Sequence, residues 1–94
     1  MTSMYHIDLS PAAQRQLKKL LSSVRHAIIK QLDSLKSTPR PDGVKKLAGI
    51  DKLYRLRIGD YRVVYTINDK QRVILVVKIG DRKEVYRHLK NVKK

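Results

Sequence analysis

The chain has 94 residues, which is enough for one domain (1–94) with a single modest hydrophobic core. Lys and Arg number 22 against 8 Asp and Glu, a formal net charge of +14, and this imbalance favours a polyanion or an acidic protein as the partner. No cysteine is present, which excludes disulfides and thiolate chemistry, and no segment approaches the ~20 apolar residues of a membrane span. We therefore expect a soluble cytoplasmic protein with no membrane partner.

The first part of the chain predicts a strand followed by a helix. Residues 5–9 alternate between apolar and polar side chains, which is typical of a strand with one buried face. Ser10 suits the N-cap of a helix and Pro11 its first position. Apolar residues at helical spacing extend this predicted helix to Leu21.

A second helix is predicted directly after the first. Ser22 and Ser23 offer a break and a new N-cap, and apolar residues at helical spacing run from Val24 to Leu35, before Pro39. Because two apolar-striped helices are joined by so few residues, we expect them to form an antiparallel pair.

A β-hairpin is predicted in the middle of the chain. Residues 39–43 are rich in Pro and Gly and indicate a loop, whereas residues 44–51 carry no clear pattern. The hairpin runs from about residue 52 to 67, with its turn at Gly59 and Asp60.

One more strand and a short helix are expected after the hairpin. Residues 68–71 indicate a turn, and residues 73–77 form an apolar run typical of an interior strand that ends at Gly80–Asp81. Asp81 and Glu84 are spaced as in a capping box, which predicts a C-terminal helix. The fold class is thus α+β: a strand, an antiparallel helix pair, three mostly antiparallel strands and a short C-terminal helix, with the helices on one face of the sheet.

Arginine side chains share one face of the predicted hairpin. Side chains alternate across a strand, so Arg55 and Arg57 lie together, and Arg62 belongs to the next strand. The tyrosines at 54, 61 and 65 fall on the apolar face, where we expect them in the core. An arginine-bearing sheet face suits a phosphate backbone, which indicates RNA as the partner and phosphodiester chemistry as the reaction.

The predicted strand-to-helix junction adds two residues to this surface. Arg82 follows Gly80 at the start of the C-terminal helix, where backbone N–H groups favour an anion, and Tyr86 offers a ring for stacking on a base. The histidines at 6, 26 and 88 lack the spacing of paired metal ligands, and no Gly-rich phosphate loop is present, so we expect neither a metal nor a cofactor.

Three blocks of sequence resemble the RelE toxin family of the RelE/ParE superfamily: Lys46–Gly49, Leu53–Tyr65 and Ile79–Arg87. The resemblance implies a RelE-like microbial ribonuclease fold and the toxin of a type II toxin–antitoxin system. It also implies a metal-independent endoribonuclease, an mRNA interferase, that enters the ribosomal A site, contacts 16S rRNA, cleaves mRNA there and inhibits translation. A cognate acidic antitoxin would bind and silence it in a hetero-oligomer.

The resemblance also assigns roles to individual residues. Arg62 would stabilise charge on the phosphoryl oxygens, Arg55 and Arg57 would hold the backbone, Arg82 would face the leaving oxygen, and Tyr86 would stack on a base. The expected catalytic residues are therefore Arg55, Arg57, Arg62, Arg82 and Tyr86. Further basic residues are expected to contact RNA: Lys46, Lys52, Lys78, Lys83, Arg87 and His88.

The chain departs from the family pattern at positions that affect proton transfer. Well-known members carry lysines where this chain has Arg55 and Arg57, and many carry histidine in place of Asp81. The expected reaction is attack of the ribose 2′-hydroxyl on the adjacent phosphate, which needs a proton acceptor, and arginine stays protonated in proteins. The candidates are His88, Asp81, Tyr86 and ribosomal RNA.

Two alternative functions fit the same sequence. A ParE-like toxin would inhibit DNA gyrase and have no nuclease activity. A non-catalytic, basic nucleic-acid-binding module would show the same charge and a steep salt dependence of binding, but would generate no new RNA ends.

Overall fold

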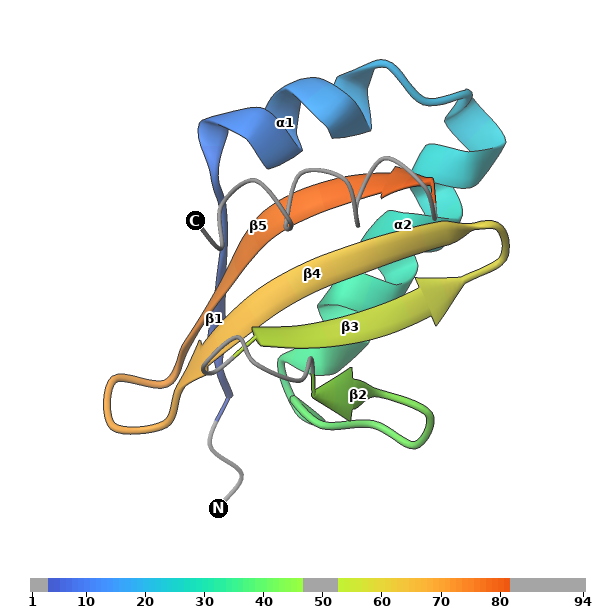
Figure 1. Ribbon diagram of the computed structural model, residues 1–94. Coiled ribbons are helices and arrows are strands. Elements are labelled where there is room, and N and C mark those ends of the chain that lie inside the picture. The colour runs from blue at the N-terminus through green and yellow to red at the C-terminus, as the bar shows by residue number, and fades with distance from the viewer. Residues whose placement is uncertain (1–3, 47–52, 82–94) are drawn as a thin grey trace, which may run out of the picture.

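Five strands form one mixed sheet, and two helices cover one of its faces (Figure 1). The computed structural model describes residues 4–46 and 53–81. The elements in chain order are β1 (His6–Leu9), α1 (Pro11–Lys18), α2 (Ser22–Leu35), β2 (Lys45–Lys46), β3 (Leu53–Ile58), β4 (Tyr61–Asn68) and β5 (Val73–Asp81). The strand order is β1-β5-β4-β3-β2, with β1 parallel to β5 and every other pair antiparallel. This confirms the α+β class. The predicted C-terminal helix lies outside the described residues.

The hydrophobic core lies between the helices and the sheet. α2 contributes Ile28, Leu32 and Leu35, and the sheet contributes inward-facing residues of β3, β4 and β5. Tyr65 is completely buried, and the other two hairpin tyrosines pack against the cluster, which confirms that they belong to the core face. Because side chains alternate along a strand, the neighbours of these residues must point to the opposite face, called here the outer face.

The helix boundaries confirm some predictions and correct others. Ser10 caps α1 as predicted, because its hydroxyl accepts a hydrogen bond of 3.1 Å from the amide of Ala13. α1 ends at Lys18 rather than Leu21, since the next amides bond to carbonyls only three residues back and tighten the chain into a turn. The N-cap position of α2 is Leu21, which has no side-chain cap, rather than a serine.

The expected antiparallel helix pair is also corrected. The helices follow each other directly, but α1 lies against β5 and β1, whereas α2 crosses behind the sheet and contacts β3 (Figure 1). Each helix buries its apolar side chains on its own part of the sheet, so the sheet rather than the other helix is its main packing partner. None of the helices in the described residues is long and apolar enough to cross a membrane.

The hairpin turn is where the sequence predicts it. Ile58 pairs with Tyr61, so Gly59 and Asp60 form a two-residue loop. Gly59 has a φ of +59°, whereas the φ of Asp60 is not positive, and this combination is that of a type II′ turn. This geometry matches the right-handed twist of the strands and brings the C-terminal end of β3 beside the N-terminal end of β4.

β5 contains a β-bulge that the sequence pattern did not reveal. Val64 pairs with Lys78 but Tyr65 pairs with Val76, so Val77 is an extra residue on β5. The bulge reverses the alternation of side chains along the strand. Val76 and Ile79 therefore both face the core, while Lys78 faces outward.

α1 satisfies backbone groups around this bulge. The hydroxyl of Ser10 donates a hydrogen bond of 3.0 Å to the carbonyl of Val77, and Oε1 of Gln16 accepts one of 2.8 Å from the amide of Ile79. These contacts stabilise the bulge, because buried backbone groups left without partners are costly. β5 ends at Asp81, which agrees with the predicted end at Gly80–Asp81.

Lys45–Lys46 form a strand in a segment that the sequence left undefined. β2 is only two residues long and pairs with β3 at the edge of the sheet. The sheet therefore has one strand more than expected. The apolar run of β5 is interior as predicted, between β1 and β4, although Leu75 on the outer face is 36% exposed.

Candidate nucleic-acid interface

Basic side chains occupy two neighbouring rows on the outer face of the sheet. The turn row, next to the β3–β4 turn, contains Arg57, Arg62 and Gly80, which pair across β3, β4 and β5. The second row contains Lys45, Arg55, Val64 and Lys78, which pair across β2, β3, β4 and β5. Together the two rows are called the arginine face. In the next row away from the β3–β4 turn, none of the described residues is a cation: Leu53, Thr66, Leu75 and Asp8.

Arg57 and Arg62 lie directly opposite each other in the turn row. Arg62 is only 7% exposed, and its Nη1 donates a hydrogen bond of 3.2 Å to the carbonyl of Tyr61. Arg57 is exposed, and its Nε donates one of 3.3 Å to the carbonyl of Gly59. Like charges directly opposite each other on antiparallel strands are destabilising, so this pair favours an anion between or above the two guanidinium groups.

Gly80 completes the turn row without adding a side chain. It pairs with Arg62 on the β5 side, so β5 itself contributes no side chain at that position. A glycine within a strand permits close approach of another backbone or ligand. The turn row therefore places a buried arginine directly opposite an exposed one, and β5 adds only a glycine to it.

The second row spreads positive charge across the sheet. Arg55 and Lys78 are half-buried on either side of buried Val64, and Lys45 is exposed at the edge. The register places Lys46 opposite Tyr54, on the core side of the sheet, so Lys46 does not share the outer face. Asp81 is opposite Tyr61, likewise on the core side.

The structure brings together four of the five described residues of the expected site; Lys46, which was expected to contact RNA, is the exception because it faces the core side. Arg55, Arg57, Arg62 and Lys78 share the outer face, although they come from three strands. Six further expected residues lie outside the described residues: Lys52, Arg82, Lys83, Tyr86, Arg87 and His88. Lys45 is the outer-face cation that sequence reasoning missed. Only the pairing of β2 with β3 distinguishes it from the adjacent lysine.

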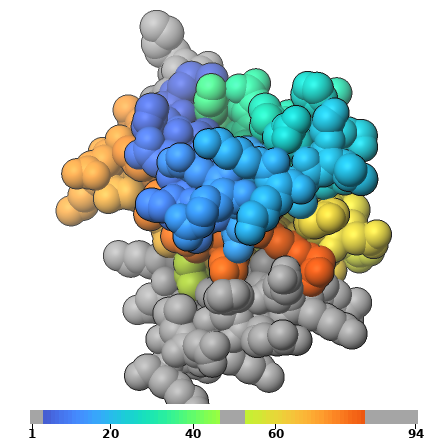
Figure 2. Space-filling view, turned by 90° about the horizontal axis from the view of Figure 1, so that it is seen from above, coloured from blue at the N-terminus to red at the C-terminus, as the bar shows by residue number. Residues whose placement is uncertain are grey.

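A small apolar pocket lies on the other side of the hairpin turn. It has a volume of about 280 Å³ and is lined by residues of α2 and of the β3–β4 turn. Figure 2 shows the start of α2 beside this turn. Its lining residues are Ser23, Val24, Ala27, Ile58, Gly59, Asp60 and Tyr61. Nearby, Leu21 is 75% exposed at the start of α2, so apolar surface is available beside the pocket.

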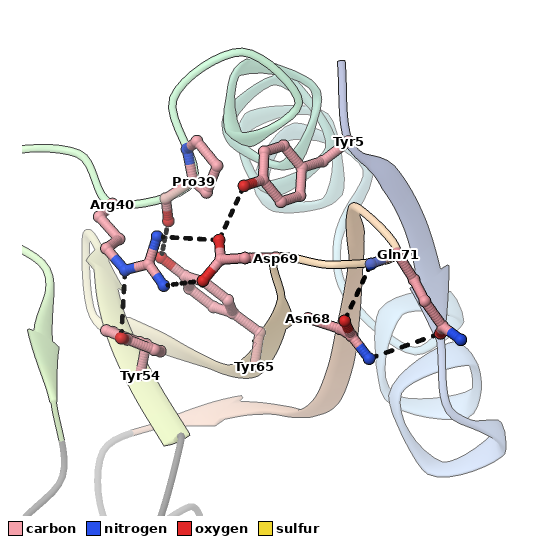
Figure 3. A network of polar contacts seen from close by, with 8 residues as sticks. All are labelled: Tyr5, Pro39, Arg40, Tyr54, Tyr65, Asn68, Asp69 and Gln71. Atoms are coloured by element: carbon pink, nitrogen blue, oxygen red, sulfur yellow. Dashed lines mark hydrogen bonds and ion pairs between the residues drawn. The ribbon is translucent and has the colours of Figure 1, made fainter. Parts of the chain in front are cut away.

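A network of hydrogen bonds lies around the β4–β5 turn (Figure 3). Arg40 donates two hydrogen bonds to the carboxylate of Asp69, at 2.9 and 3.3 Å, and one of 3.1 Å to the hydroxyl of Tyr54. The hydroxyl of Tyr5 donates to the same carboxylate at 2.7 Å. The bonds from Arg40 and Tyr5 hold the pKa of Asp69 below its usual value.

Tyr65 links the same region to the core. Its hydroxyl donates a hydrogen bond of 2.8 Å to the carbonyl of Pro39, and its ring stacks on that of Tyr54 at 5.9 Å (Figure 3). Burial, with a smaller contribution from Tyr54, raises the pKa of Tyr65 to about 12. Tyr65 therefore stays neutral and acts as a hydrogen-bond donor at neutral pH.

Comparisons with known proteins show that this chain is similar to toxins of toxin–antitoxin systems. The profile of the family described as "ParE toxin of type II toxin-antitoxin system, parDE" matches residues 7–86. The mRNA interferase toxin RelE of Escherichia coli K12 is 35% identical over 86 residues, which cover 87% of this chain and 90% of that protein.

Solved structures share the fold over nearly the whole chain. The archaeal RelE–RelB complex from Pyrococcus horikoshii has a TM-score of 0.75 and 33% identity, and the match covers 87% of this chain and 97% of that one. The intact E. coli RelBE toxin–antitoxin complex has a TM-score of 0.74 and 30% identity, with 83% and 96% covered.

Proposed function

Because the chain belongs to the RelE/ParE family of type II toxin–antitoxin toxins, we propose that it is a ribosome-dependent mRNA endonuclease that cleaves with its arginine face. The observation that carries this proposal is the turn row, in which buried Arg62 lies opposite exposed Arg57 with a glycine on its other side. A similar protein in E. coli is an mRNA interferase, and the two cationic rows suit an RNA backbone.

The proposed reaction is an in-line displacement within the RNA. The ribose 2′-oxygen attacks the adjacent phosphorus, the bond from phosphorus to the 5′-oxygen breaks, and the products carry a 2′,3′-cyclic phosphate and a 5′-hydroxyl. Negative charge grows on the phosphoryl oxygens during this step. Guanidinium groups fixed beforehand at that position stabilise it without further reorganisation, and the chemistry requires no metal ion.

Arg62 is the residue best placed to supply that stabilisation. Its burial and its bond to the carbonyl of Tyr61 restrict the guanidinium before substrate arrives. Arg57 and Arg55 contribute charge from the neighbouring strand. In the same proposal Arg82 faces the leaving oxygen and Tyr86 stacks on a base.

The proton acceptor is none of Arg55, Arg57 and Arg62, because arginine does not lose its proton in proteins. Among the described acids, Asp81 lies at the end of β5 opposite Tyr61, on the core side of the sheet. A base from the C-terminal segment or from ribosomal RNA is therefore the better supported source.

Arg62→Ala tests the proposal, with Arg15→Ala on α1 as the control for an equal loss of charge. We expect that inducing Arg62→Ala no longer arrests growth. New 5′ ends in translated mRNA, mapped by primer extension, should fall at least about 100-fold, because removal of a single transition-state donor lowers the rate by about 10²–10³. Arg15→Ala should behave like the parent. A folded Arg62→Ala protein that cuts translated mRNA as fast as the parent refutes the assignment.

The name of the matching profile favours one alternative, a ParE-like toxin that inhibits DNA gyrase and cleaves no RNA. A supercoiling assay distinguishes the two functions. Inhibition of purified gyrase by the wild type, with translated mRNA left intact, would support the alternative. The opposite pair of results supports the nuclease.

We also propose an acidic antitoxin as the partner. The net charge of +14 needs neutralising, and the similar P. horikoshii and E. coli toxins were crystallised with RelB. The pocket beside α2 and exposed Leu21 offer a surface on which the apolar face of an amphipathic helix can dock. Calorimetric titration with the small acidic protein encoded beside this gene checks the pairing, and an absence of binding counts against it.

A further inference from the structure

The edge strand β2 adds one cation to the arginine face. Lys45 pairs with Arg55, and Lys46 pairs with Tyr54. Residues paired directly across antiparallel strands point to the same face. Lys45 is therefore an outer-face residue, whereas its neighbour belongs to the core side.

The segment that leads into β2 is anchored to the rest of the sheet. Arg40 bonds to Asp69 in the β4–β5 turn and to Tyr54 on β3, and its guanidinium lies 5.3 Å from the centre of the Tyr54 ring (Figure 3). The carbonyl of Pro39 accepts the hydroxyl of buried Tyr65. The amide of Val44 then bonds to the carbonyl of Pro41 at 3.1 Å, immediately before β2. These contacts hold the backbone of β2 at a defined position beside β3.

With Lys45 included, positive charge crosses the sheet from its β2 edge to β5. The second row has cations on three of its four strands, at Lys45, Arg55 and Lys78. Neighbouring strands are about 4.8 Å apart and successive rows on one face about 6.6 Å apart, so Lys45 is one row and one strand away from Arg57. That separation suits contact with a phosphate next to the one held in the turn row.

We propose that Lys45 binds the RNA backbone at a phosphate flanking the scissile one, and that the substrate strand crosses the sheet from the β2 edge toward β5. This inference rests on the proposed nuclease function and adds to it the path of the substrate. Lys45 acts through binding, since it is too far along the edge to share the phosphate of the turn row.

The adjacent lysine provides a matched control. Lys45→Ala and Lys46→Ala remove the same charge from the same exposed edge, one on each face of the sheet. Cleavage of mRNA on purified ribosomes is measured at limiting and at saturating toxin, over a range of KCl concentrations. Lys45→Ala should lower kcat/KM about 5–10-fold with little change in kcat, and flatten the slope of log kcat/KM against log salt by about 0.7, the value for one phosphate contact in a single strand.

Lys46→Ala should match the wild type, and Lys45→Arg should recover most of the lost kcat/KM because it restores the charge. Equal kcat/KM and equal salt slopes for the two alanine variants, with an active wild type, overturn the inference and leave the nuclease function standing. If the wild type cuts no ribosome-bound mRNA, the nuclease function fails and the role of Lys45 fails with it.

Discussion

Gln16→Ala should destabilise the protein by removing a side chain that satisfies the bulge in β5. Oε1 of Gln16 accepts a hydrogen bond of 2.8 Å from the amide of Ile79, and Ile79 is only 1% exposed. The substitution leaves this buried N–H without its acceptor, which costs about 1–3 kcal/mol. For a domain of this size each kcal/mol lowers Tm by about 4–8 °C.

Gln14→Ala is the matched control on the same helix. Gln14 makes a side-chain hydrogen bond of its own, in which Nε2 donates to the carbonyl of Leu9 at 3.0 Å, but this bond is exposed to solvent. The two variants share the small gain in helix propensity from alanine, so their difference reports the buried bond. Gln14→Ala should change stability by no more than about 0.5 kcal/mol.

Thermal unfolding followed by circular dichroism measures both variants, and amide exchange of Ile79 locates the effect. Because the bulge turns Lys78 outward and places Gly80 beside Arg62, Gln16→Ala should also slow RNA cleavage well below its Tm. Gln16→Glu, which keeps an acceptor oxygen, should restore Ile79 protection. Identical Tm values and identical Ile79 exchange in Gln16→Ala and Gln14→Ala would refute this reasoning.

Three further substitutions test other parts of the structure. Tyr65→Phe should lower the free energy of unfolding by about 1–3 kcal/mol, because the carbonyl of Pro39 loses its donor. The pKa of Tyr65 is raised from 10.0 to about 12, so the stabilisation from its hydroxyl is present below pH 10 and fades as the pH rises toward 12. The unfolding curves of the wild type and Tyr65→Phe should therefore converge near pH 12. The bond from Arg40 lowers the pKa of Asp69, so the ionised carboxylate stabilises the fold above the unfolded-state pKa of about 3.9, and this stabilisation is lost as the pH falls below that value. The difference in Tm between the wild type and Asp69→Asn should therefore disappear in acid, and a constant difference would count against the ion pair. Gly59→Ala should lose about 1–2 kcal/mol in a urea titration because alanine is strained at a φ of +59°, whereas an unchanged midpoint would show that the turn relaxes.

The hairpin could be predicted because its signals are local. Apolar and basic residues alternate along β3, Arg62 lies between apolar Tyr61 and Val63 on β4, and Gly59–Asp60 suits a two-residue turn. The common face of Arg55, Arg57 and Arg62 followed directly from these signals. The cap of α1 was likewise visible in Ser10.

Features that depend on distant contacts could not be predicted. The bulge at Val77 interrupts an apolar run with no change of composition, and it depends on Ser10 and Gln16 from another element. β2 is too short for any periodic pattern, so only its pairing with β3 separates the faces of its two lysines. Helical spacing identified the apolar sides of the helices but not the strands they would contact.

The rate of the chemical step on ribosome-bound mRNA shows whether Arg62 stabilises the transition state. Single-turnover cleavage is measured with toxin in saturating excess, so that binding no longer limits the rate and the transition-state role of Arg62 is isolated. We expect a rate constant for Arg62→Ala at least about 100-fold below that of the wild type, with ribosome binding retained. A rate constant equal to that of the wild type would contradict it.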